Sequence, residues 1–276
     1  MQKRHKKIRV IMTIFILLSQ IAFIACSKEE SKMVTIKNNI LVVGHRGASG
    51  YAPENTLSAM KKAIEMRAAM SELDVQETAD GEIILLHDAS LKRTSGVDKN
   101  IWETNYADLK GLDMGSWFSK DYIDEPLPTL KEIIDLVRGK MKLNIELKAN
   151  QHEKMLAERS LKVVTDNNFL DQVVFTSFKF DEIRKIRELN KEAKVGYIFG
   201  KLPEDVDVFS EDVDLLSAHY KTVDADFIQK AKAAGKEVAV WTVNEPADMN
   251  RMIEIGVDQI ITNYPDILRK VLDGKM

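Results

Sequence analysis

The stretch from Glu72 to Asp88, ELDVQETADGEIILLHD, holds two short runs of alternating apolar and polar residues with a turn between them. Asp80 and Gly81 lie in that turn, and an Asp-Gly pair between two such runs is a strong signal of a β-hairpin. The runs are too close together for the helix that a parallel crossover requires. The second run is therefore expected to pair antiparallel with the first and to bring Leu86 and His87 back beside Asp74.

Around this hairpin, short β-branched runs alternate with amphipathic segments from Ile40 onward. Nine segments have strand character, and because one of them is only the return arm of the hairpin, eight remain for a parallel sheet. This pattern, sustained over about 250 residues, predicts an α/β fold, a (β/α)8 TIM barrel, with a doubly wound open sheet as the structural alternative. The predicted strands cover 40–43, 70–75, 83–86, 143–147, 173–176, 194–199, 215–219, 237–242 and 259–262, and the predicted helices cover 56–69, 129–138, 152–167, 180–190, 224–234 and 246–255.

A segment without helical periodicity, 89–128, follows the hairpin and is rich in Gly, Asp, Trp and Tyr. It ends at Pro126 and Pro128, just before the predicted helix that starts near Thr129. We interpret it as a small insertion after the second barrel strand. Because the loops at the carboxyl ends of barrel strands carry the active sites of this architecture, the insertion is expected on that face.

The first 25 residues have the composition of an export signal. Five cations and no acid precede an apolar run from Val10 to Ala25, which is too short for an ordinary transmembrane helix. The run ends in Phe23-Ile24-Ala25-Cys26, which resembles the lipobox of bacterial lipoproteins with Phe23 in place of the usual leucine. We expect a signal peptide over 1–25, with a retained anchor helix as the alternative.

The resemblance implies that Cys26 receives a lipid and attaches the chain to a membrane. The polar residues that follow predict a tether over 26–38, with the barrel domain over 39–276. The protein is thus expected to be exported and lipid-anchored to the bacterial cell envelope, on its periplasmic or surface side.

Charge and cysteine content exclude two classes of protein. The chain has 40 Lys+Arg against 43 Asp+Glu, a formal net charge of −3, and loss of the cationic signal would make it more acidic. No nucleic-acid partner is expected, since such binding rests on an excess of positive charge. The single cysteine cannot form an internal disulfide.

Carboxylates are concentrated on two predicted strands. Glu72 and Asp74 are two residues apart and share one face of a strand, as do Glu146 and Lys148 on the next parallel strand. The apolar residues between them occupy the face toward the helices, so the charged side chains are expected to point into the barrel. Three inward carboxylates, Glu72, Asp74 and Glu146, form an oxygen-rich site that suits Ca²⁺ or Mg²⁺. An internal salt bridge between Lys148 and Glu146 is the structural alternative.

The chemistry-bearing residues follow a recognisable order along the chain. They are His45-Arg46, Pro53-Glu54-Asn55-Thr56, Glu72-x-Asp74, His87-Asp88, Glu146-x-Lys148 and Trp241-Thr242-Val243-Asn244. This order resembles that of the glycerophosphodiester phosphodiesterase family, from about Leu41 to Pro265. The resemblance implies a TIM barrel with an insertion after the second strand, one divalent cation held by the three carboxylates, and His45 and His87 as the general acid–base pair.

The expected substrate, a small glycerophosphodiester, is an anion that an acidic chain would repel unless cations are placed locally. Arg46 and Lys148 can supply that charge, and Arg46 suits a bidentate grip on phosphate oxygens. Trp241 is expected in the wall of the glycerol pocket, with core packing as the alternative. Thr56 or Asn55 is expected to cap the first helix.

The implied reaction is metal-dependent hydrolysis of a glycerophosphodiester to glycerol 3-phosphate and an alcohol. Two alternatives stay open from the sequence. One is a phospholipase-type phosphodiesterase that acts on intact lipids, which a membrane anchor would favour. The other is a lipoprotein that binds glycerophosphodiesters without turnover, although such a protein would need the cations and not the two histidines.

Overall fold

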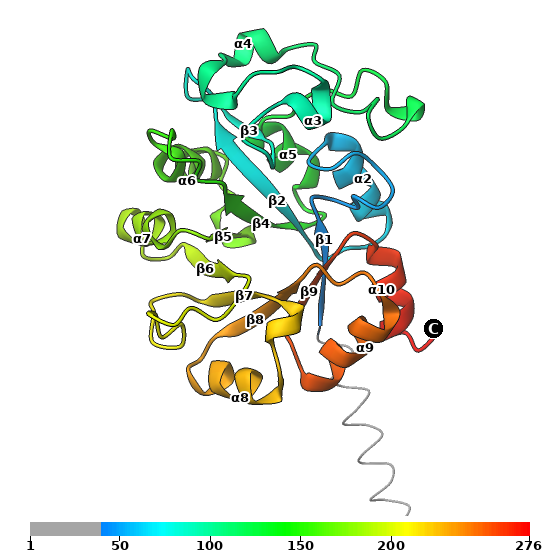
Figure 1. Ribbon diagram of the computed structural model, residues 1–276, viewed down its shortest axis with the longest axis vertical. Coiled ribbons are helices and arrows are strands. Elements are labelled where there is room, and N and C mark those ends of the chain that lie inside the picture. The colour runs from blue at the N-terminus through cyan, green and yellow to red at the C-terminus, as the bar shows by residue number, and fades with distance from the viewer. Residues whose placement is uncertain (1–39) are drawn as a thin grey trace, which may run out of the picture. The chain divides into compact units, whose positions relative to one another are not determined.

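Eight parallel strands close into a barrel in the computed structural model, which describes residues 40–276 (Figure 1). The barrel strands are β1 (Leu41–His45), β2 (Met70–Glu77), β4 (Lys142–Leu147), β5 (Val173–Ser177), β6 (Lys194–Phe199), β7 (Leu215–His219), β8 (Glu237–Trp241) and β9 (Gln259–Thr262). Strand β1 pairs in parallel with both β2 and β9, which closes the ring. The predicted (β/α)8 barrel is confirmed, because the doubly wound alternative would leave the sheet open.

The ninth strand, β3 (Ile83–Leu85), is the return arm of the predicted hairpin. It pairs antiparallel with β2, in a register that places Val75 opposite Leu85. Gly81 occupies the turn with a φ of 90°, a conformation that favours glycine. The amide of Leu86 donates to the carbonyl oxygen of Asp74 over 3.1 Å, so the chain does return beside Asp74 as predicted.

Helices surround the strands on the outside of the barrel (Figure 1). The longer ones are α2 (Leu57–Glu65), α5 (Leu130–Val137), α6 (Leu156–Asp166), α7 (Phe180–Leu189), α8 (Ala225–Ala233), α9 (Pro246–Ile255) and α10 (Pro265–Leu272). All but α10 were predicted, with ends that differ by up to four residues. Helix α10 begins with a proline at its first turn and buries Leu268 and Val271 at helical spacing, so the sequence did carry its signal.

Side chains at the helix starts explain where the chain turns from loop to helix. Thr56 caps α2, as predicted, by accepting a hydrogen bond from the amide of Ala59 over 3.2 Å. Thr129 and Glu132 form a capping box at the start of α5. These caps fix the start of α2, which follows the turn after β1, and the start of α5, which follows the insertion.

The insertion after β2 and β3 contains only short helical turns. These are α3 (Lys92–Ser95), α4 (Tyr106–Leu109) and two 3-10 turns, η1 (Ile101–Glu103) and η2 (Lys120–Tyr122). It encloses its own apolar cluster of Ile84, Leu86, Leu91, Ile101, Leu109, Met114 and Leu127. Glu125 accepts hydrogen bonds from the amide and the hydroxyl of Ser58, which fastens the insertion to the start of α2. Figure 1 shows the insertion beyond the carboxyl end of β2, as predicted.

The apolar residues of the strands separate into two regions. On β2, Leu73 and Val75 belong to the large core between strands and helices, whereas Met70 belongs to a small cluster inside the barrel with Val43 and Val174. The interior near the start of β2 is therefore apolar, and the polar residues that follow on the same face lie nearer its carboxyl end.

No helix within residues 40–276 is both long and apolar enough to cross a membrane. The predicted export signal of 1–25, the lipid attachment at Cys26 and the tether of 26–38 lie outside the described residues.

Candidate active site

A pocket with about 520 Å³ of empty space, partly open to solvent, lies at the carboxyl end of the barrel. Most of the residues predicted for the site line it, namely His45, Arg46, Glu72, His87, Glu146, Lys148 and Trp241. Asp74 is 1% exposed and adjoins this group through Glu72 and Glu146. The structure thus brings together residues that are as far apart in sequence as His45 and Trp241.

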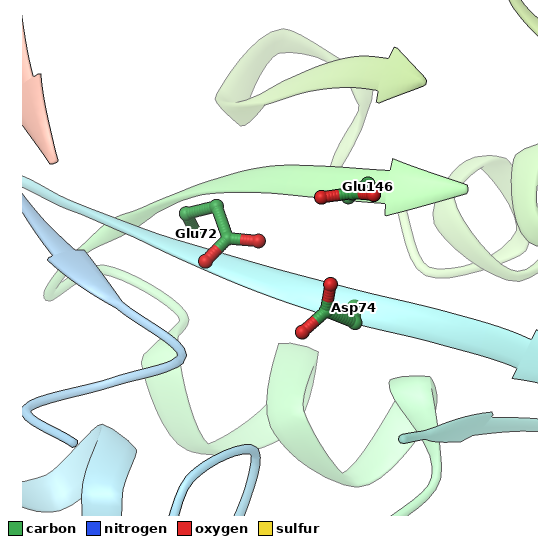
Figure 2. Close-up of side chains that lie close together, drawn as sticks. All are labelled: Glu72, Asp74 and Glu146. Atoms are coloured by element: carbon green, nitrogen blue, oxygen red, sulfur yellow. The ribbon is translucent and has the colours of Figure 1, made fainter. Parts of the chain in front are cut away.

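Three buried carboxylates converge beside the pocket. Figure 2 shows Glu72 and Asp74 on β2 and Glu146 on the neighbouring strand β4, with their carboxylates turned toward one another. One oxygen from each lies within 4.8 Å of the others. Burial and the neighbouring negative charges raise the pKa of Glu72 well above its usual value and that of Glu146 to about 7. The inward direction predicted from strand alternation is confirmed.

Two cationic side chains lie against the three carboxylates but do not neutralise all of them. Arg46 Nε is 3.1 Å from Asp74 Oδ2, and Lys148 Nζ is 2.9 Å from Glu146 Oε1 and 3.8 Å from Asp74 Oδ1. Although burial opposes ionisation, these cations hold the pKa of Asp74 below its usual value. The salt bridge considered as an alternative to a cation site is therefore present, and it engages only one oxygen of Glu146.

The carboxylate group fits a hard divalent cation. Three carboxylates face two cationic side chains, one of which, Arg46, is shared with Glu54. Asp74 Oδ1 is buried and has no hydrogen-bond partner among the described residues. Carboxylate oxygens are the ligands that Ca²⁺ and Mg²⁺ prefer, and an unpartnered buried oxygen is costly unless a cation or proton compensates it.

His45 is the last residue of β1, and Arg46 begins the turn that follows. Gly47 has a φ of 86°, and a Cβ atom at this position would lie 2.5 Å from Ala59, so only glycine allows the turn to approach α2. His45 Nδ1 lies 2.7 Å from Asn263 Oδ1, an acceptor, which places the ring proton on Nδ1 and leaves the lone pair on Nε2. Burial and the charge of Arg46 lower the pKa of His45 to about 4, so its imidazole is neutral at pH 7.

His87 follows the hairpin and is held in the same tautomer. Its Nδ1 lies 2.7 Å from Asp88 Oδ1, which leaves Nε2 available to the pocket. The backbone of this segment is fixed by Gln76, whose amide nitrogen donates to the carbonyl oxygens of Leu86 and Asp88 over 2.9 and 2.7 Å. A short loop that carries a catalytic candidate is thus tied to a barrel strand.

Apolar side chains, Phe178, Ile198, Trp241 and Ile261, also line the pocket. Trp241, at the end of β8, lines the pocket and donates from its indole nitrogen to the carbonyl oxygen of Ser217 over 3.1 Å. Phe178 packs against it edge to face, with ring centroids 5.7 Å apart. Trp117, in the insertion, is 42% exposed and does not line this pocket.

Several residues support the site in a way that was not predicted from the sequence. Asn55 donates to Asp74 Oδ2 over 2.8 Å and accepts from the amide of Asp74, so its role is to hold a carboxylate and not to cap α2. Gln76 continues the alternation of Glu72 and Asp74 on the same strand face, so a signal for it was present. Asn263 and Arg93 carried no comparable signal.

Comparison with known proteins identifies the family of the chain. A model of the glycerophosphoryl diester phosphodiesterase family matches residues 45–267. The glycerophosphodiester phosphodiesterase of Caldanaerobacter subterraneus is 32% identical over 232 residues, which are 83% of this chain and 96% of that protein. The Bacillus subtilis protein of the same name is 31% identical over 257 residues, covering 86% and 88% of the two chains.

A solved structure agrees with these relatives. The phosphodiesterase of Oleispira antarctica, determined in complex with the product sn-glycerol-3-phosphate, matches with a TM-score of 0.77 at 31% identity, over 84% of this chain and 96% of that one. This protein therefore belongs to the glycerophosphoryl diester phosphodiesterase family and is a hydrolase of phosphoric diesters.

Proposed function

We propose that the enzyme hydrolyses glycerophosphodiesters to glycerol 3-phosphate and an alcohol, with one divalent cation and with His45 and His87 as the general acid–base pair. The observation that carries this proposal is the meeting of three buried carboxylates with two histidines, both held through Nδ1, at one pocket. The product bound in the Oleispira antarctica structure supports the choice of substrate.

The cations of the pocket are suited to hold the phosphate. Arg46 is fixed through Nη1 by Glu54 and through Nε by Asp74, and Nη2 makes no hydrogen bond within residues 40–276. Lys148 adds a second positive charge that Glu146 orients. A bound Ca²⁺ or Mg²⁺ at Glu72, Asp74 and Glu146 would supply further positive charge to the phosphate as negative charge builds up in the reaction.

The two histidines perform the proton transfers. One removes a proton from the attacking hydroxyl while the other gives a proton to the leaving oxygen, which requires one neutral and one protonated imidazole at the start. Attack by the glycerol 2-hydroxyl would form a cyclic phosphate that water then opens, and direct attack by water would not. Phosphorus NMR during turnover separates these routes by the presence or absence of the cyclic species.

A coupled assay for glycerol 3-phosphate tests the proposal directly. With glycerophosphocholine and glycerophosphoethanolamine as substrates, we expect release of glycerol 3-phosphate that a chelator abolishes and that Ca²⁺ or Mg²⁺ restores. Activity that is indifferent to chelation would contradict the metal dependence. Release of phosphocholine would move the scissile bond to the other side of phosphorus.

The same assay addresses the two alternative functions. Turnover of intact phospholipid vesicles in preference to the deacylated substrates would indicate a phospholipase-type enzyme. Binding of glycerophosphocholine in a calorimeter without any product would indicate a binding lipoprotein.

We propose further that residues 1–25 direct export and that Cys26 carries the lipid that anchors the enzyme to the cell envelope. The arrangement of the basic segment, apolar run and cysteine supports this proposal. We expect metabolic labelling with a radioactive fatty acid to mark the wild-type chain and not a Cys26→Ser variant. A Cys26→Ser variant that stays in the membrane fraction with its first 25 residues intact would instead support a retained anchor helix.

A further inference from the structure

A series of ion pairs runs from His87 to Arg46, and Arg93 lies at its centre. Arg93 donates through Nε to Asp88 Oδ2 over 2.6 Å, and Asp88 holds His87 through its other oxygen. On its far side, Arg93 donates to both oxygens of Glu54 over 3.0 and 2.7 Å. Glu54 Oε1 in turn accepts from Arg46 Nη1 over 2.8 Å. One carboxylate therefore separates Arg93 from each of two residues that line the pocket.

The shape of the arginine side chain suits this bridging position. All three guanidinium nitrogens are engaged, one with Asp88 and two with Glu54. A lysine, whose single ammonium is a compact point charge, could not satisfy both carboxylates with this planar geometry. Because the Arg93 side chain is 40% exposed, solvent screens its charge. Its main contribution is therefore to orient the carboxylates of Asp88 and Glu54 through hydrogen bonds.

We propose that Arg93 is a positioning residue that fixes His87 and Arg46 in one arrangement, so that the insertion which carries it completes the active site. This inference rests on the proposed function, because it assumes that His87 transfers a proton and that Arg46 holds the phosphate. Arg93 itself does not line the pocket and acts through Asp88 and Glu54.

Two further observations support the bridge. The hydrogen bond from Arg93 lowers the pKa of Asp88 to about 2, so Asp88 remains an ionised acceptor for His87 Nδ1 at any pH of interest. The guanidinium also lies against a second part of the insertion, with its Cζ atom 5.6 Å from the ring centroid of Trp117. The insertion therefore holds Arg93 from α3 and from the segment around Trp117.

An Arg93→Met variant tests the proposal, with Lys92→Met as the matched control on the same short helix. Among residues 40–276 the Lys92 ammonium pairs only with the exposed Asp98, over 3.0 Å, so its loss should leave activity unchanged. For Arg93→Met we expect kcat/KM for glycerophosphocholine to fall by about 10- to 100-fold, the range for removal of groups that orient catalytic residues. A lower kcat is expected through His87 and a higher KM through Arg46, while the thermal midpoint and cation binding stay close to wild type.

Double variants separate this role from a general loss of structure. With Asp88→Asn already present, Arg93→Met should add little further loss of kcat, and with Glu54→Gln present it should add little further increase of KM. Losses that simply multiply, or an Arg93→Met enzyme that matches Lys92→Met, would overturn the inference. Should Arg93→Met unfold, Arg93→Lys, which keeps the positive charge, replaces it in the comparison with Lys92→Met. A partial loss of kcat/KM is then expected.

The outcomes also distinguish this inference from the proposed function. A folded, metal-loaded wild-type enzyme that releases no glycerol 3-phosphate overturns the proposed function itself. An active wild type whose Arg93 variants are equally active overturns only the positioning role.

Discussion

A Glu72→Gln enzyme is expected to lose nearly all hydrolysis and, at the same time, to be more stable than wild type when no cation is bound. The substitution removes one of three carboxylates that could hold the cation. A bound cation contributes several kcal/mol of charge stabilisation, and each ~1.4 kcal/mol is a factor of ten, so we expect kcat/KM to fall by about 10³-fold. Within residues 40–276 the Glu72 carboxylate accepts one hydrogen bond, from the amide of Arg46 over 3.0 Å, and a glutamine oxygen can still accept it.

The gain in stability follows from the raised pKa of Glu72. Burial, followed by the charges of Asp74 and Glu146, raises this pKa well above its usual value of 4.5. The folded chain then binds more protons than the unfolded chain once the pH exceeds 4.5, so stability falls as the pH rises from 4.5 toward the folded-state pKa. Glutamine does not ionise and avoids this loss, so the variant should gain stability near pH 7 and not near pH 4.

Urea unfolding with and without cation measures both effects. In the presence of excess Ca²⁺ or Mg²⁺, binding to the native state should stabilise wild type and leave Glu72→Gln almost unchanged, which reverses their order. Equal cation-dependent stabilisation of the two proteins would show that Glu72 is not a ligand.

Glu77 provides a matched control on the same strand. It is also buried, but it pairs with Arg159 and accepts hydrogen bonds from the amides of Lys154 and Met155 over 2.8 and 3.0 Å. Removal of its charge should therefore destabilise the cation-free protein, by about 2 kcal/mol for hydrogen bonds to a charged group, while the folded variant retains activity. Opposite changes in the stability of the cation-free protein, a gain at Glu72 and a loss at Glu77, would distinguish an unneutralised carboxylate from a paired one.

The sequence predicted the barrel because its decisive signals are local. The Asp80-Gly81 turn and the alternation on its two sides depend on neighbouring residues only, and they reduced nine strand segments to eight parallel strands and one return arm. Strand ends were less well predicted. The first strand extends to His45, beyond the predicted end at 43, because Gly44 and His45 pair with Ser71 and Glu72 on β2. The sequence of the first strand alone does not reveal this pairing.

The same distinction applies to the site. Strand alternation alone placed Glu72, Asp74 and Glu146 on inward faces, and the barrel then brought them together. The partners that orient the catalytic candidates could not be found this way. Asn263 lies 218 residues from His45 in sequence, and Arg93 reaches Glu54 across 39 residues, so only the closed barrel and the packed insertion create these contacts.

Alanine in place of His45 or His87 is expected to lower kcat by about 10²- to 10⁴-fold, the usual contribution of a general acid or base. Each imidazole is held by an acceptor at Nδ1 and offers Nε2 to the pocket, and alanine removes that nitrogen. Neither side chain belongs to the carboxylate group, so cation-dependent stabilisation should persist in both variants. His152→Ala is the control, because His152 is exposed and stacks on Trp102 with ring centroids 4.1 Å apart, away from the pocket lining.

A substrate with a better leaving group identifies which histidine is the general acid. A glycerophosphodiester with a p-nitrophenyl leaving group needs little protonation as the bond breaks, so the variant that lacks the general acid should regain most of its rate on this substrate. The variant that lacks the general base should remain slow on both substrates, since the attacking hydroxyl still has to lose its proton. The pKa of His45, lowered to about 4, keeps its imidazole neutral and favours it as the base, so we expect recovery in His87→Ala. Recovery in His45→Ala would reverse the assignment, and losses below about tenfold in both variants would remove the pair from the proton transfers altogether.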